Sequence, residues 1–410
     1  MVTIIPFKAL RPEAQLAKQV ASRPYDVLNR KEAKVEAQGN PLSFLHITKS
    51  EIGLPDSVDI HSQEVYDKAK ENLSAFISRN ILFRENKPCY YIYNLTMNGR
   101  SQAGLVCGSS VDDYENGLIK KHEFTRPEKE KDRIDHMITI GAQTGNVFLA
   151  YKNVEEIDAV INGWIKEKNP QYDFIAEDGI QHSIWIVNDD ATIEKISTLF
   201  KEKVPATYIA DGHHRAASAA KVRKALGNTA TENADYFLTT LFPSNQLAIL
   251  DYNRVITDLN GLDEAGFLSK LEEKFVVEKV TEQHKPTAPH EFGLYLQKQW
   301  YKLTAKPDTF NANDAIEVLD ISILQNNLLD PVLGIKDQRT DKRIDFIGGI
   351  RGLGELEKRV DSGEMKLAIS LYPVSIEQLF AVADSGEVMP PKSTWFEPKL
   401  RDGLLTHFLD

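Results

Sequence analysis

The apolar positions of the chain follow two different spacings, and the spacing changes from segment to segment. Residues 61–79 carry apolar side chains at helical spacing, which predicts an amphipathic helix. Apolar runs predict strands at Tyr90–Leu95 and Ser101–Cys107, and Asn98 with Gly99 between them is the strongest short hairpin signal. Helices and strands therefore alternate along the chain, which indicates an α/β or α+β architecture.

The remaining segments extend this alternation without an internal repeat. The other expected strands include Ser43–His46, Val147–Tyr151, Thr207–Ala210, Tyr236–Leu241, Tyr252–Ile256 and Lys366–Leu371. The other expected helices cover 154–166, 263–274, 317–329 and 375–383. We divide the chain into three regions, 1–145, 146–260 and 261–410, which can also pack as one compact unit.

The stretch Thr207–Ala220 combines a short strand, a tight turn and the start of a helix rich in alanine. Gly212 permits a backbone turn that a side chain would forbid. The first amides of a helix have no partner within the helix, and the helix dipole adds partial positive charge there. Arg215 adds a full charge in the first turn, so this helix start suits a phosphate or carboxylate group.

Two other interpretations of this stretch stay open. Asp211 can be a helix cap whose carboxylate accepts the unpaired amides, which would occupy the place that an anion needs. His213 and His214 argue against a simple cap, because a cap needs neither of them. A metal site is less favoured, since neighbours on a helix point about 100° apart and the sequence has no HExxH or CxxC pattern.

A second polar stretch, Lys120–Arg133, precedes and begins a helix. Thr125 followed by Glu128 fits a capping box, with a proline in the first helical turn. His122 and Glu123 come directly before that cap, and a histidine beside a carboxylate can act as an acid/base unit. A charged face in solvent is the alternative interpretation.

The third polar stretch, Met389–Lys399, is held extended by its prolines. Lys392 offers a charge, and Ser393 and Thr394 offer two hydroxyl groups. A loop in solvent is the alternative, but the neighbouring Trp395-Phe396 pair favours a loop that packs onto the protein.

Composition and charge narrow the class of protein. The 410 residues are 42% hydrophobic and 27% charged, which is typical of a soluble globular protein with a sizeable core. The formal net charge of −11 disfavours a general nucleic-acid binder. No apolar run is long enough to cross a membrane, and we expect a cytoplasmic protein. Cys89 and Cys107 lie in apolar surroundings, which favours buried free thiols over a disulfide.

Residues Asp211–Arg215 resemble the DGHHR signature of the ParB/sulfiredoxin superfamily, which includes free-serine kinases. In that superfamily the loop and helix start hold nucleotide phosphates. The resemblance implies a mixed α/β fold, with a ParB/sulfiredoxin-like core built on a mixed sheet and a second α+β region.

The whole set of motifs resembles an uncharacterised bacterial and archaeal family, domain of unknown function 1015. The matching segments are Arg23–Val27, Asn40–Pro41, Lys121–Arg133, Ile209–Arg215, Leu319–Asp320 and Met389–Thr394. Three residues differ from those common in the family: Glu397, Asn253 and Ala216. These differences affect the expected size and polarity of a pocket more than the expected reaction centre. Genes of the family often lie beside serine-biosynthesis genes, which points towards serine or phosphoserine.

The resemblance implies phosphoryl transfer between a nucleotide and a small hydroxyl metabolite such as serine. The expected catalytic residues are Asp211, His122, Glu123 and His213. The expected phosphate- and nucleotide-binding residues are Gly212, His214, Arg215, Arg126, Lys392, Ser393 and Thr394. Asp211 is also the expected ligand of Mg²⁺ that accompanies ATP or ADP, and we expect the three polar stretches to line a single cleft.

Two alternatives from other classes remain. The protein can be a sensor that binds a nucleotide or a phosphorylated metabolite without turnover. A ParB-like nucleic-acid partner is the least favoured, because the net charge is acidic. We expect a small phosphorylated ligand as the partner, with no nucleic acid and no membrane, and assembly into a homo-oligomer is compatible with the sequence.

Overall fold

The computed structural model describes all 410 residues, which form two compact units. Unit 1 comprises Met1–Leu247 and Pro398–Asp410, and unit 2 comprises Ala248–Glu397. The expected mixed α/β architecture is confirmed. The boundaries differ from the three regions expected from the sequence, because strands from both sides of position 145 pair within one sheet.

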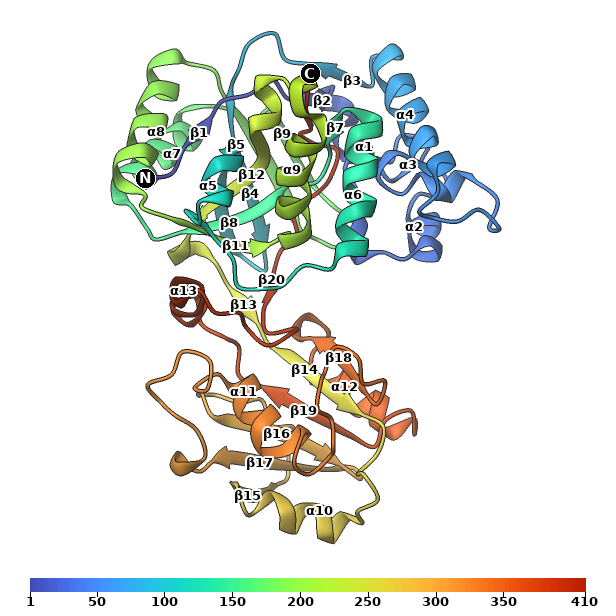
Figure 1. Ribbon diagram of the computed structural model, residues 1–410, viewed down its shortest axis with the longest axis vertical. Coiled ribbons are helices and arrows are strands. Elements are labelled where there is room, and N and C mark those ends of the chain that lie inside the picture. The colour runs from blue at the N-terminus through green and yellow to red at the C-terminus, as the bar shows by residue number, and fades with distance from the viewer. The chain divides into compact units, whose positions relative to one another are not determined.

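A nine-stranded mixed sheet forms the centre of unit 1 (Figure 1). Its strands follow the order β6-β11-β8-β12-β5-β4-β10-β9, and β1 also pairs with β5. The pairs β6/β11 and β8/β12 are parallel, whereas β8/β11 and β5/β12 are antiparallel. The strands are β1 (Ile4–Ile5), β4 (Tyr90–Met97), β5 (Arg100–Ser110), β6 (Ile119–Lys120), β8 (Val147–Tyr151), β9 (Tyr172–Ile175), β10 (Gln181–Val187), β11 (Thr207–Asp211) and β12 (Tyr236–Pro243).

Helices complete unit 1, some packed on this sheet and others packed on one another. They are α1 (Ala17–Val20), α2 (Arg30–Glu36), α3 (Leu45–Thr48), α4 (Gln63–Ser78), α5 (Val111–Glu115), α6 (Pro127–Ile140), α7 (Glu155–Glu167), α8 (Asp190–Lys203) and α9 (His213–Leu226). The largest apolar cluster joins side chains of α5, α7, α8 and α9 to one face of the sheet. The alanines of α9 are buried, so this helix lies close to its neighbours, with α6 at its side (Figure 1). Two short strand pairs complete the unit, β2 (Leu10–Pro12) with β3 (Leu82–Arg84) and β7 (Ala142–Gln143) with β21 (His407–Phe408).

Unit 2 is built on a six-stranded antiparallel sheet in the order β15-β17-β16-β19-β14-β18. Its strands are β14 (Tyr252–Ile256), β15 (Phe275–Val280), β16 (Glu291–Leu296), β17 (Gln299–Ala305), β18 (Ile344–Gly348) and β19 (Leu367–Leu371). The helices are α10 (Glu264–Leu271), α11 (Asp320–Leu324), α12 (Leu353–Asp361) and α13 (Ile376–Ser385). Near its two ends β13 (Ile249–Leu250) pairs with β20 (Trp395–Phe396).

Local sequence signals place several elements correctly. Asn98 and Gly99 have φ of 51° and 78°, the left-handed conformation that a tight hairpin between β4 and β5 requires. Cys89 and Cys107 are free and buried, as expected. No helix in the structure combines the length and the apolar character that crossing a bilayer demands.

Two local predictions are wrong. The predicted strand Ser43–His46 overlaps helix α3, and a short apolar run does not distinguish a strand from a buried helix. The predicted capping box at Thr125 does not form, because Arg126 is the N-cap of α6 and no side chain caps it. The Thr125 side chain bonds the carboxylate of Glu130 instead.

Candidate functional site

The turn between β11 and α9 leaves the start of α9 uncapped. Asp211 is the last residue of β11, and Gly212 (φ 97°) is the N-cap, with no side chain bonded to the first-turn amides. A Cβ at Gly212 would be strained by this φ and would lie 3.4 Å from the Val147 Cα. The helix-cap interpretation of Asp211 is therefore wrong, since its Oδ2 lies 3.4 Å from the Nζ of Lys399.

The side chains of His213 and His214 hold the loop before α6 against the start of α9. The backbone N–H of His122 donates to Nε2 of His213 at 3.4 Å, and the N–H of Arg126 donates to Nε2 of His214 at 3.0 Å. A ring nitrogen that accepts a hydrogen bond carries no proton, so both imidazoles are neutral here. They can contribute positive charge towards a phosphate only after these two bonds break.

His122 and His213 form a buried imidazole pair beside Asp211. Their ring centroids lie 4.5 Å apart with the ring planes at 86°. Burial lowers the pKa of His122 to about 4, although the charge of Asp211 opposes the shift. Burial and the neighbouring His122 hold the pKa of His213 well below its usual value. Nδ1 of His122 is buried without a protein partner, so it is the ring nitrogen that a ligand could use.

Glu123 faces the second imidazole of this pair. Its Oε2 lies 3.7 Å from Nδ1 of His213. The carboxylate and histidine that the sequence places side by side at 122 and 123 therefore interact with α9. Arg126 contributes its backbone to the same contact surface, while its side chain is exposed.

Asp211 is an ionised carboxylate in a half-buried position. Burial alone would raise the pKa of Asp211, but the charges of Lys399 and Arg215 outweigh it and hold the pKa below its usual range. The turn thus places a negative side chain directly beside unpaired helix amides and two cations.

Arg215 links α9 to two distant parts of unit 1. Its Nη2 donates to both carboxylate oxygens of Asp26 at 2.9 and 2.7 Å, and its Nη1 donates to the carbonyl oxygen of Asn146. Asp402 lies in the same charge cluster and accepts the backbone N–H of Tyr25 at 3.4 Å. Burial raises the pKa of Asp402 to about 7, while the charge of Arg215 opposes this shift.

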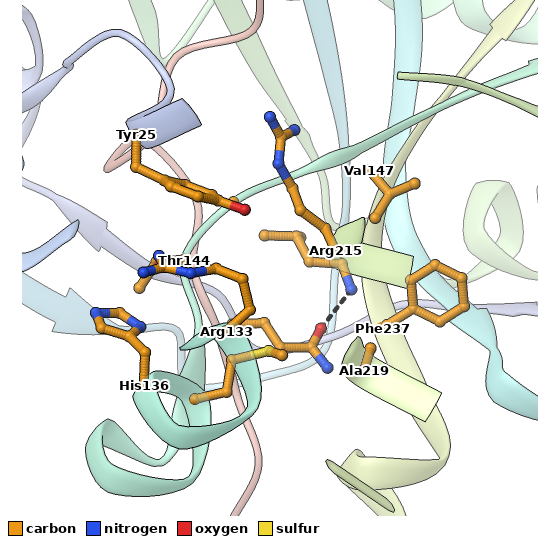
Figure 2. A pocket seen from close by; sticks show the side chains of 12 residues that line it. Tyr25, Arg133, His136, Thr144, Val147, Arg215, Ala219 and Phe237 are labelled. Atoms are coloured by element: carbon orange, nitrogen blue, oxygen red, sulfur yellow. Dashed lines mark hydrogen bonds between the residues drawn. The ribbon is translucent and has the colours of Figure 1, made fainter. Parts of the chain in front are cut away.

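A small, partly open pocket lies beside Arg215 (Figure 2). Tyr25, Arg133, His136 and Thr144 line its polar side, and its volume of about 30 Å³ has room for one or two water molecules. Cζ of Arg133 lies 4.0 Å from the centroid of the Tyr25 ring, within cation–π distance. In this conformation the pocket can take a small group and no nucleotide.

The metal interpretation fails on the donor set. No group of three or more His, Cys, Asp or Glu side chains is arranged to hold a metal ion. The ammonium group of Lys399 lies beside the Asp211 carboxylate, so Asp211 does not fit a resident Mg²⁺ site. Magnesium in nucleotide reactions is commonly held in large part by the phosphates, and here it would arrive as part of the substrate.

The third polar stretch belongs to unit 2. Lys392 has φ 59°, and its carbonyl oxygen accepts a hydrogen bond from Nη2 of Arg254 at 3.0 Å. The Ser393 hydroxyl donates to the carbonyl oxygen of Pro390, and Thr394 follows in the same loop. The loop is packed onto unit 2, as the Trp395-Phe396 pair indicated. A single cleft shared with the start of α9 stays a prediction.

Sequence reasoning did not select four residues of the cluster: Tyr25, Asp26, Lys399 and Asp402. Tyr25 and Asp26 lie in the Arg23–Val27 segment, which carried part of the family resemblance. Asp402 has no local signal, because only the pairing of the chain end with the 22–25 segment brings it to Arg215.

Comparisons with known proteins identify a family and several solved structures of low similarity. The profile of DUF1015, described as a protein of unknown function, matches residues 4–322. No curated protein matches the chain. A mutant free serine kinase in complex with AMP has 12% identity, covers 75% of this chain and 91% of its own, and has a TM-score of 0.39. SbnI with a C-terminal truncation from Staphylococcus aureus has 12% identity and a TM-score of 0.39, and the match covers 74% of this chain and 87% of SbnI. A conserved hypothetical protein from Pyrococcus furiosus has 13% identity and a TM-score of 0.35, and the match covers 74% of this chain and 94% of that protein.

Proposed function

The chain belongs to the DUF1015 family of proteins of unknown function, and we propose that it transfers a phosphoryl group between a nucleotide and a small hydroxyl metabolite. Serine and phosphoserine are the metabolites to test first. The proposal rests on one observation, the uncapped start of α9 beside an ionised, half-buried Asp211.

Phosphoryl transfer depends mainly on positioning and on neutralising charge on the phosphate oxygens. The unpaired amides of α9 and its dipole supply that at fixed positions. Lys399 is the nearest movable cation, because its ammonium group lies within 3.4 Å of Asp211 and can turn to a phosphate oxygen. That movement would release the hold of Lys399 on Asp211 and raise the pKa of its carboxylate.

Asp211 would then accept the proton of the attacking hydroxyl group as a general base. His122 would orient the substrate through its unpartnered Nδ1, and Glu123 would keep the neighbouring His213 in its present orientation. We propose a second phosphate clamp formed by Lys392, Ser393 and Thr394. Substitution of these residues in the binding and turnover assay described next would test it.

The test combines binding and turnover. Titration calorimetry with Mg·ATP and Mg·ADP measures nucleotide affinity, and phosphorus NMR of mixtures with L-serine, D-glycerate or glycerol detects a phosphorylated product. We expect both binding and product formation. Binding without product from any hydroxyl compound would favour the sensor, and absence of nucleotide binding would contradict the proposal.

A further inference from the structure

The pocket behind Arg215 contains hydrogen-bond donors with no acceptor in the protein. Nε of Arg215 is buried and unpartnered. Arg133 directs Nε and Nη2 to Asp132, which leaves Nη1 without a bond inside the protein. The hydroxyl groups of Tyr25 and Thr144 also lie at the pocket, and in Figure 2 the Tyr25 hydroxyl points between the two arginines. Of these donors, Nε of Arg215 is the one that is buried without a partner. An unpaired buried donor is costly, so this nitrogen favours an acceptor in the pocket.

The two guanidinium groups of the pocket flank one aromatic ring. Cζ of Arg133 lies 4.0 Å and Cζ of Arg215 lies 5.7 Å from the centroid of the Tyr25 ring. The carboxylates of Asp132 and Asp26 pair with these cations at nitrogens other than the unbonded ones. The unbonded nitrogens, Nη1 of Arg133 and Nε of Arg215, thus remain for a further anionic acceptor.

Of the neighbouring titratable groups, His136 is neutral and Asp402 is partly protonated at neutral pH. Nε2 of His136 is bonded to the carbonyl oxygen of Ile47, and burial lowers the pKa of His136 to about 4. Burial raises the pKa of Asp402 to about 7, so this carboxyl is protonated in a large fraction of molecules.

The opposite wall of the pocket is apolar. Val147, Ala219 and Phe237 line it, and all three are buried. An apolar wall gains nothing from a bare inorganic phosphate, whereas it can contact the carbon atom that carries a carboxylate. The small volume excludes a nucleotide.

We propose that this pocket binds the carboxylate of the small hydroxyl metabolite, so that the acceptor is a short hydroxy or amino acid. Nη1 of Arg133 and Nε of Arg215 would pair with its oxygens, and the Tyr25 and Thr144 hydroxyls would donate to them. The role of this acid as phosphoryl acceptor rests on the proposed function. Its binding to the pocket needs neither nucleotide nor turnover.

The experiment measures binding in the absence of nucleotide. Calorimetric titrations of the full chain use L-serine, D-glycerate and glycolate, each paired with its carboxylate-free analogue: serinol, glycerol and ethylene glycol. We expect at least one acid to bind, with its analogue about tenfold or more weaker because charge-assisted hydrogen bonds are lost.

Two mild variants locate the binding. Tyr25→Phe and Thr144→Val each remove one hydroxyl group and should weaken the acid several-fold while leaving its analogue unchanged. Tyr295→Phe, in unit 2, is the matched control and should bind as the wild type does. Thermal melts of each variant confirm that the fold is retained.

Several outcomes would overturn the inference: no acid binds, the acid and its analogue bind equally, or inorganic phosphate is the ligand that the two variants weaken. Carboxylate binding without any phosphoryl transfer would leave the pocket assignment standing and remove the proposed function. Equal turnover of the acids and their carboxylate-free analogues would support the proposed function and remove the pocket assignment.

Discussion

Nη2 of Arg215 donates hydrogen bonds to both carboxylate oxygens of Asp26, at 2.9 and 2.7 Å, across 189 positions of sequence. The guanidinium group is almost fully buried, and the carboxylate is about one-third exposed. Helix α9 is thereby tied to the N-terminal segment at the point where the candidate site begins. The pair positions Arg215 for the site and contributes to the stability of unit 1.

Asp26→Asn removes the negative partner of a buried cation. We expect the free energy of unfolding to fall by about 2 kcal/mol, because charge-assisted hydrogen bonds of Arg215 become neutral ones. Urea unfolding followed by circular dichroism measures the change. Asp56→Asn is the control, since Asp56 is exposed and should shift stability by less than about 0.5 kcal/mol. Equal effects of the two variants would mean that Asp26 contributes nothing specific.

The pKa of Asp402 predicts a pH-dependent term in stability. Burial raises this pKa from 3.8 to about 7, so the folded protein keeps a proton that the unfolded chain releases near pH 4. The contribution of Asp402 is complete below pH 4 and is lost as the pH rises through 7. The stability of the wild type relative to Asp402→Asn should therefore decline between pH 4 and 7, at most by about 1.4 kcal/mol per pH unit.

Urea titrations of both proteins at four pH values give this difference directly. Asp190→Asn, a change at an exposed carboxylate in α8, serves as the control. A constant difference between wild type and Asp402→Asn across the range would show that Asp402 is ionised in the folded protein.

Gly145→Ala probes the space around Arg215. The added Cβ would lie 3.3 Å from Cδ of Arg215 and 3.5 Å from its Nε, so the side chain has to shift by a few tenths of an ångström. We expect weaker binding of the hydroxy acid and a stability loss of about 1 kcal/mol. Gly163→Ala meets nothing within 4 Å in helix α7, and it should stabilise the protein by up to about 1 kcal/mol without changing binding. Unchanged acid binding in Gly145→Ala would mean that Arg215 does not contact the bound acid.

Asp211→Asn distinguishes catalysis from sensing. The amide keeps the shape of the side chain but cannot accept the proton of a hydroxyl nucleophile, so turnover should fall by about 10²- to 10⁴-fold. Nucleotide affinity should stay the same or increase, because a negative charge next to the phosphates is removed. Calorimetry and the product assay are run on the same preparation. A variant that turns over as the wild type does would exclude Asp211 as the base.

The fold was predictable where a signal is local. The hairpin between β4 and β5 follows from Asn98 and Gly99, and the β11–α9 turn follows from Gly212 and the alanines after it. The error at Ser43–His46 arose because a short apolar run suits either a strand or a buried helix, and tertiary packing decides between them.

The candidate site was predictable only in part for the same reason. His122, Asp211 and Arg215 stand in unusual polar stretches, so they were found. Lys399 and Asp402 look like ordinary surface residues in sequence, and their roles depend on contacts with residues almost two hundred positions or more away. The acceptor roles of His213 and His214 also depend on contacts that no spacing rule describes.

The insertion of unit 2 between two parts of unit 1 affects how the protein is made on the ribosome. The segment that contains Asp211 and Arg215 leaves the ribosome early. Lys399 and Asp402 leave it only after all of unit 2 has been translated. During that interval the cluster around α9 lacks two of its charged members, and β7 lacks its partner β21. The nascent chain therefore cannot have the complete cluster until the final segment has been translated and pairs with unit 1.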